Sequence, residues 1–142
     1  MRTHLWCCVL AVVTLIAGCG MMDQSDKPEA QAGIKAAGAW LSLLDASDYT
    51  GSWSNAATFF RNAVPCDQWV TSMNAFRAPM GKSLSRKVKT ARLATTLPGA
   101  PDGHYVLIQY DSSFDHKKDA VETTTMMLET NGQWFVSGYF IR

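Results

Sequence analysis

The spacing of apolar residues changes about halfway along the chain. Over residues 29–46 apolar side chains recur every three or four positions, which is typical of an amphipathic helix. The same spacing predicts helices over residues 50–63 and 67–76, and Asp67 is the expected N-cap of the last one. Three helices are therefore expected in the first half of the chain.

From residue 83 onward the period is about two, as in strands. Strands are expected over residues 83–97, 104–114 and 120–130, and a fourth follows the turn formed by Asn131 and Gly132. Helices followed by strands indicate an α+β fold. We expect N-terminal helices packed on a curved antiparallel sheet of about four strands, with a pocket between the two layers.

The final strand is apolar on both faces. Such a strand should be central in its sheet and covered on both sides. The helices can cover only one face, so a homodimer through the sheet is the simplest expectation for the other, and a different partner stays open. One face would carry Trp134, Val136 and Phe140, and the other Phe135, Tyr139 and Ile141.

Residues 1–18 are excluded from the fold, because a short basic start and an apolar run are typical of a secretory signal. Ile16-Ala-Gly-Cys19 resembles a bacterial lipobox, in which the cysteine is acylated and anchors the protein to membrane lipid. The alternatives are an ordinary secretory signal cleaved nearby or an uncleaved anchor. Residues 19–28 would form a polar tether of at most about 30 Å, and residues 29–142 a single domain. Gly20 after the cysteine matches the sorting pattern of outer-membrane lipoproteins, so we expect a periplasm-facing location.

Removal of the signal and acylation of Cys19 would change both the number of free cysteines and the net charge. Only Cys66 would remain as a free thiol, which excludes an internal disulfide and favours a small buried side chain. Of 13 basic and 12 acidic residues, Arg2 leaves with the signal, so 12 of each remain and the formal charge is zero. A neutral domain is not expected to bind nucleic acid. Basic residues gather in residues 68–101 and acidic ones in residues 102–129, which we interpret as pairing between neighbouring strands.

An ordered set of short motifs resembles the bacterial family known as domain of unknown function 4019. The resemblance implies small exported or lipid-anchored domains with the cystatin-like cone of the nuclear transport factor 2-like superfamily. No activity or catalytic residue is established for that family, so none is carried over. The motifs are Ala39-Trp-Leu-x-Leu-Leu-Asp45, Phe59-x-Arg61, Arg77-x-Pro-x-Gly81, Leu97-Pro-x-x-Pro-Asp-Gly103 and Gly132-x-Trp-x-Val-x-Gly-Tyr139.

Candidate chemistry is sparse. Asp111 and Glu122 are the carboxylates that could act as acid or base inside an apolar pocket. The favoured interpretation of Glu122 is structural, either as the ion-pair partner of Arg77 or Arg86 or as part of a solvated face. The two arginines flank a stiff turn and could instead bind an anion. His104 and His116 lack ligand partners at metal-binding spacing, and no phosphate loop is present, so neither metal nor cofactor is expected.

Two classes of function remain. Trp53 and Trp134 are core or pocket-lining residues that could contact an apolar ligand or a glycan. The favoured class is a non-catalytic binding or scaffolding domain tethered at the membrane, whose partner is a small molecule or an envelope protein. The alternative is a small hydrolase or isomerase using a pocket carboxylate. The lack of an acid–base pair at recognisable spacing favours the first.

Overall fold

The helices precede the sheet along the chain, as expected for an α+β fold. The structure is a computed structural model in which residues 22–142 are described. The predicted signal segment, residues 1–18, and the predicted lipidation site Cys19 lie outside the described residues. In chain order the elements are α1 (Pro28–Asp45), α2 (Tyr49–Ser54), α3 (Thr58–Ala63), α4 (Cys66–Phe76), the short 3-10 helix η1 (Ala78–Met80), β1 (Ser83–Ala94), β2 (Tyr105–Phe114), β3 (Lys117–Leu128) and β4 (Trp134–Ile141).

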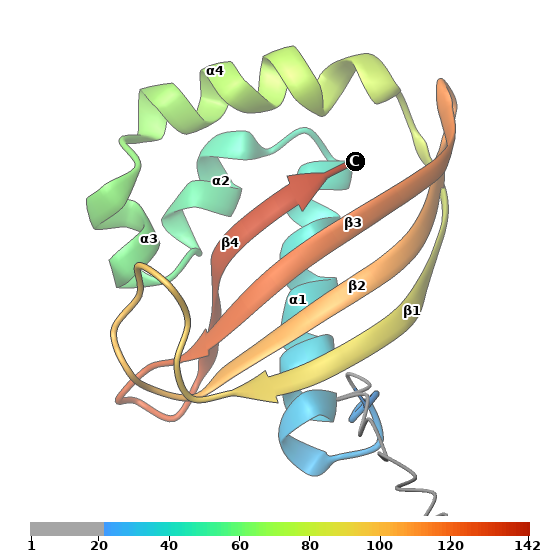
Figure 1. The fold of residues 1–142 in the computed structure, drawn as a ribbon. Helices are drawn as coiled ribbons and strands as arrows, with labels where there is room; N and C mark the ends of the chain where they lie inside the picture. The colour runs from blue at the N-terminus through green and yellow to red at the C-terminus, as the bar shows by residue number, and fades with distance from the viewer. Residues whose placement is uncertain (1–21) are drawn as a thin grey trace, which may run out of the picture.

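The four strands form an antiparallel meander in the order β1-β2-β3-β4. The strands curve, and α1 lies across one face of the sheet, which we call the inner face, while α2, α3 and α4 lie beyond β4 (Figure 1). Among residues 22–142 no helix covers the opposite, outer face. The predicted α+β class is confirmed, and the cystatin-like cone stays a prediction.

The hydrophobic core lies between α1 and the inner face. Ala91, Ile108, Met126 and Val136, one from each strand, are almost completely buried there. Gly33 lets α1 approach the sheet closely, because a Cβ atom at this position would lie 2.9 Å from Cγ2 of Val106. A side chain at position 33 would therefore push α1 away from β2.

The helix predicted over residues 50–63 is in fact two short helices, α2 and α3. Between them the backbone N–H of Ala57 donates to the carbonyl oxygen of Val136 at 2.8 Å, and Ala56 forms a parallel bridge with the same residue. Contact with β4 thus replaces helical hydrogen bonds at this point. Asp67 is also misplaced in the prediction, since it lies in the first turn of α4 and Pro65 is the N-cap.

The predicted central position of β4 is wrong, because β4 is an edge strand. The predicted division of its faces is wrong as well. Thr125 pairs with Gly138 and Met126 with Val136, so Ser137 is the extra residue of a β-bulge. The bulge shifts the alternation, which puts Tyr139 on the inner face and leaves the Phe140 side chain 54% exposed.

The outer face is mixed in polarity. One cross-strand row consists of Thr90, Gln109, Thr123 and Phe140. The outer-face Phe140 of β4 is therefore continued by polar residues on the neighbouring strands. The homodimer through the sheet stays a prediction.

The edge of β1 is partly covered by the segment before α1. The carbonyl oxygen of Ala91 accepts from the backbone N–H of Gln24 at 2.8 Å. The backbone N–H of Ala91 donates to Oδ1 of Asp23, and that of Leu93 donates to Oε1 of Gln24, both at 2.9 Å. Two residues of the predicted tether over residues 19–28, Asp23 and Gln24, are therefore hydrogen-bonded to the domain.

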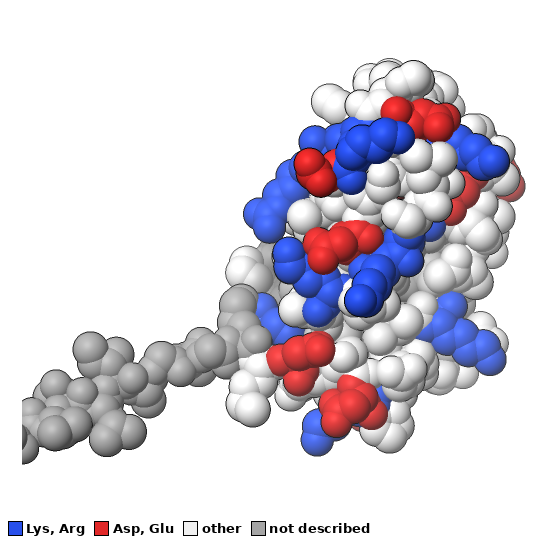
Figure 2. Space-filling view, turned by 90° about the vertical axis from the view of Figure 1, so that its right-hand side faces the viewer, with Lys and Arg blue, Asp and Glu red and all other residues white. Residues whose placement is uncertain are grey.

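Charged side chains of both signs are interspersed on the face that carries the β1 edge (Figure 2). Lys89 Nζ lies 3.3 Å from Oδ1 of Asp111 on the neighbouring strand. The predicted pairing of basic β1 with the acidic strands is thus observed. None of the helices in residues 22–142 has the length and hydropathy needed to cross a membrane.

Candidate functional site

Glu122 lies at the centre of a polar network on the inner face. Its side chain is 0% exposed. Each of the other three strands supplies one side chain that donates to it. The donors are Arg86 Nε to Oε1 (2.7 Å) and Nη2 to Oε2 (3.2 Å), Ser112 Oγ to Oε1 (2.6 Å) and Tyr139 Oη to Oε2 (2.7 Å).

Asp45, the last residue of α1, extends the network towards the helices. Arg86 donates to both of its carboxylate oxygens, at 2.8 and 3.0 Å. Arg77, the residue after α4, donates to Oδ1 of Asp45 at 3.1 Å and to the carbonyl oxygen of Gly81 at 2.8 Å. The guanidinium of Arg77 also lies over the ring of Phe114, 4.5 Å from its centroid.

The formal charges of this network cancel, because Arg77 and Arg86 face Asp45 and Glu122. Burial opposes ionisation of Asp45, but hydrogen bonds and charge from Arg86 and then Arg77 outweigh it and lower the pKa of that carboxyl. Burial likewise disfavours the Arg86 cation, and the two carboxylates outweigh it and raise its pKa. Burial, followed by the charge of Glu122, raises the pKa of the Tyr139 hydroxyl.

This arrangement holds Glu122 as a structural ion pair. Both carboxylate oxygens already accept two hydrogen bonds each. A general base needs an oxygen within hydrogen-bond reach of the substrate proton. Of the two structural interpretations from the sequence, the ion pair is observed with Arg86 as the partner, and the solvated face is wrong because Glu122 is buried.

A cleft of about 370 Å³ lies next to the network, between α4 and the end of β4. We call it the α4–β4 cleft. Arg77 and Tyr139 belong to both the network and the cleft lining. Phe76 and Phe140 also line it, and these side chains are 70% and 54% exposed. The remaining lining is Phe60, Val64, Gln68, Trp69, Ser72, Met73, Met80 and Ile141.

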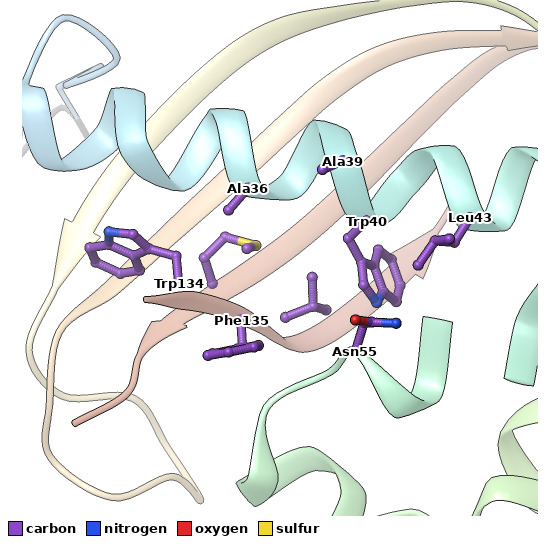
Figure 3. Close-up of a pocket in the computed structure, with 9 residues that line it drawn as sticks. Ala36, Ala39, Trp40, Leu43, Asn55, Trp134 and Phe135 are labelled. Atoms are coloured by element: carbon purple, nitrogen blue, oxygen red, sulfur yellow. The ribbon is translucent and has the colours of Figure 1, made fainter. Parts of the chain in front are cut away.

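A second hollow of about 330 Å³ lies between α1 and the start of β4. Figure 3 shows Trp134 at one end of the lining and Leu43 at the other, with Phe135 and Trp40 between them. Its lining contains Asn55 but no charged residue. We favour the α4–β4 cleft as the site, because it combines apolar walls with exposed aromatic rings and the edge of the network.

The tryptophans are mainly structural. Trp40 and Trp69 are buried and donate their indole N–H groups to the backbone oxygen and the hydroxyl of Ser52, at 2.8 and 2.9 Å. Trp53 is half-buried and donates to the carbonyl oxygen of Val64 at 2.7 Å. Trp134 is half-buried and lines the hollow beside α1. Trp53 does not line the α4–β4 cleft, so the predicted pocket residues do not form one site.

The structure does not place Asp111 in an apolar pocket, since its side chain is 60% exposed beside Lys89. Cys66 is half-buried at the start of α4, which matches neither a fully buried side chain nor an exposed thiol. Within residues 22–142 no cluster of three or more His, Cys, Asp or Glu side chains could hold a metal ion.

Three members of the network were not predicted from the sequence, namely Asp45, Ser112 and Tyr139. A signal was available for Asp45, because a negative charge at the C-terminal end of a helix opposes the helix dipole and calls for a cationic partner. Ser112 and Tyr139 carried no such signal. Their roles depend on strand register, and for Tyr139 on the bulge at Ser137.

No curated protein matches the chain. Residues 36–139 match the family described as "Protein of unknown function (DUF4019)". The match spans well over half of the 142 residues and includes Asp45, Arg77, Arg86 and Glu122. The chain therefore belongs to the DUF4019 family.

Proposed function

We propose that this protein is a lipid-anchored, non-catalytic binding domain of the bacterial cell envelope. The observation that carries the proposal is the α4–β4 cleft, an apolar cleft of about 370 Å³ with Phe76 and Phe140 exposed at it. Apolar clefts with a few polar groups are the usual form of small-molecule and peptide sites. Exposed aromatic rings beside such a cleft are typical of interaction surfaces.

The hydrolase or isomerase alternative has less support. Such an enzyme would need a pocket carboxylate free to take a proton, whereas Glu122 accepts four hydrogen bonds and Asp45 lies between two arginines. These contacts favour a network that fixes α1, α4 and the four strands relative to one another. The cleft beside it would then be a rigid binding surface.

The membrane anchor is supported by the resemblance of Ile16-Ala-Gly-Cys19 to a lipobox. Acylation of Cys19 would place the anchor three residues before Met22, a span of at most about 11 Å. Since Asp23 and Gln24 are bonded to β1, the β1 edge would lie near the membrane surface. The α4–β4 cleft lies at the other edge of the sheet and would face the periplasm. An outer-membrane location is part of this proposal.

The cleft is tested on the folded domain with 1-anilinonaphthalene-8-sulfonate, an anionic fluorescent probe whose aromatic rings bind apolar surfaces. We expect saturable binding that weakens at least 10-fold in Ser72→Phe, because Ser72 lines the cleft and a phenyl ring would fill it. Thr71→Phe is the matched control, since Thr71 is exposed and outside the lining. Equal binding by both variants would place the probe elsewhere and contradict the proposed site.

The anchor is tested separately in cells. Cys19→Ser should move the protein from the membrane fraction to the soluble periplasmic fraction. Unchanged membrane association would contradict lipidation at Cys19. Native mass spectrometry of the protein purified from its own envelope would then show which small molecule or protein it retains.

A further inference from the structure

We propose that the α4–β4 cleft is a strand-addition site for an extended peptide segment of a partner protein. The segment would pair with the free edge of β4 and place alternate apolar side chains in the cleft. This inference rests on the proposed function, because both use the same cleft. It adds the chemical class of the partner and the atoms that would recognise it.

The backbone of β4 presents unpaired groups on the side of the cleft. In an antiparallel pair, residues alternate between those that exchange hydrogen bonds with the partner strand and those that do not. Arg142 exchanges both bonds with Val121, at 3.0 and 3.1 Å. The alternation therefore directs the N–H and C=O groups of Ile141 and Tyr139 away from β3. Among residues 22–142 these groups have no backbone partner on that side.

The same edge already accepts a backbone partner further along. The β-bulge at Ser137 reverses this alternation towards the start of β4, so the C=O of Val136 points outward, and it accepts the N–H of Ala57 at 2.8 Å. Ala56 and Val136 form a parallel bridge at this point. Strand pairing on the outer edge of β4 thus begins within the chain itself and stops before Tyr139. A peptide would continue that pairing.

The walls of the cleft favour apolar side chains. Trp69, Met73 and Phe76 of α4 lie on one side, with Ile141 and Phe140 of β4 on the other. Arg77 is the charged residue of the lining, and its charge is balanced by Asp45 at 3.1 Å. Because side chains alternate along a strand, a bound segment would turn every second residue into the cleft and the others to solvent.

Two other occupants are less favoured. The segment before α1 is bound to Ala91 and Leu93 at the β1 edge, on the opposite side of the sheet. A second copy pairing through its own β4 would bring its α4 against the first, since α4 borders this edge in each copy. An extended peptide carries no helix beside its edge. We therefore commit to a peptide segment and treat the second copy as an outcome of the test.

The test uses a fluorescein-labelled peptide of alternating valine and threonine with terminal lysines. Its matched control has the same side chains and N-methylated backbone nitrogens. We expect saturable binding in fluorescence anisotropy, weakened at least 10-fold by N-methylation. We also expect hydrogen exchange at the Tyr139 and Ile141 amides to slow on binding, while the Phe140 amide, which faces β3, changes little.

Variants separate the backbone contribution from the side-chain contribution. Ile141→Pro removes the outward N–H and should weaken binding at least 10-fold, whereas Ile141→Val keeps it and should bind within about threefold of wild type. Phe76→Ser, in α4, should weaken binding. Leu84→Ser is the control, because Leu84 is also an exposed apolar residue but lies on β1, and this variant should bind as the wild type does. The amide exchange on the unmodified chain keeps the test valid if a variant folds poorly.

Each outcome has a distinct meaning. Equal binding of the N-methylated peptide, or unchanged exchange at Tyr139 and Ile141, overturns strand addition and leaves the proposed function standing. Binding of 1-anilinonaphthalene-8-sulfonate in the cleft without peptide binding has the same meaning. Loss of both contradicts the proposed function as well. A dimer in sedimentation velocity that Ile141→Pro dissociates would assign the edge to a second copy and overturn the peptide proposal.

Discussion

The two edges of the sheet are protected in different ways. At the β1 edge, Asp23 and Gln24 bond to the backbone of Ala91 and Leu93. The β1 strand also carries basic side chains, which discourage pairing with other chains. At the β4 edge, the backbone N–H of Ala57 bonds to the carbonyl oxygen of Val136. The later residues of β4, from Tyr139 to Ile141, border an apolar cleft. An edge left open beside apolar side chains is a place where another chain can bind.

The polar network joins these two edges through the interior. Arg86 belongs to β1 and Tyr139 to β4, and both donate to Glu122 of β3. The position of β4, and with it the shape of the cleft, therefore depends on a buried carboxylate. Substitutions in the network and at each edge should therefore separate how far each edge depends on its own contacts.

Glu122→Gln should have the largest effect on stability. It leaves Arg86 without one of its two carboxylates and leaves Tyr139 facing an amide, so we expect a loss of about 3–5 kcal/mol in the free energy of unfolding. Urea denaturation measures this loss. Asp119→Asn is the matched control, because Asp119 is an exposed carboxylate on the same strand, and it should change stability by less than about 0.5 kcal/mol. Similar values for the two variants would contradict the structural role of Glu122.

Asp45 should make the fold sensitive to acid. The pKa of Asp45 is lowered in the folded state. The ionised carboxylate therefore contributes fully to the free energy of unfolding at pH values above the ordinary pKa of 3.8. This contribution is lost as the pH falls through the lower pKa of the folded state. Asp45→Asn should remove this part of the acid dependence and cost about 1.5–3 kcal/mol at neutral pH, through lost hydrogen bonds to charged groups. Urea denaturation at pH 7 and at steps below pH 4 measures both. An unchanged acid dependence in the variant would exclude Asp45 as its source.

Asp23→Ala should loosen the β1 edge without affecting β4. It removes the acceptor of the Ala91 N–H, which would then be left without this partner. We expect faster amide exchange at Ala91 and unchanged exchange at Phe140. Asp26→Ala, at an exposed residue of the same segment, is the control. Equal exchange at Ala91 in both variants would show that Asp23 does not protect this edge.

Phe76→Ser should have the smallest effect on stability, within about 0.5 kcal/mol, because the side chain is 70% exposed. Thermal denaturation measures it against Leu84→Ser, which changes another exposed apolar side chain. A marked loss specific to Phe76→Ser would mean that this residue stabilises α4 instead of remaining available for binding. The contrast between a partly covered β1 edge and a β4 edge available for binding would then weaken.

Part of the fold could be read from local patterns. The period of the apolar residues predicts α1 within one residue at each end, and the change to a period of two predicts four strands in the second half of the chain. These features depend on which residues lie within a few positions of each other, so the sequence carries them directly. The break between α2 and α3 could not be found in this way, because it depends on the contact of Ala57 with β4.

The candidate site was likewise predicted in part, by its residue types but not by its long-range contacts. The amino-acid types were sufficient to single out Arg77, Arg86 and Glu122, since arginines and a carboxylate in an otherwise apolar domain need partners. Which carboxylate pairs with which arginine was decided by the tertiary structure. Asp45 lies 32 positions from Arg77 and 41 from Arg86, and such separations leave no local pattern.

The sequence by itself determined the α+β class, the family resemblance and the presence of a strongly apolar last strand. The tertiary structure alone decided that this strand lies at an edge and that the bulge at Ser137 turns Tyr139 inward. The physical reason is that the residues of a strand determine how apolar it is, while its neighbours in the sheet determine which of its backbone groups are paired. That unpaired backbone, and not the apolar pattern, defines the proposed binding edge.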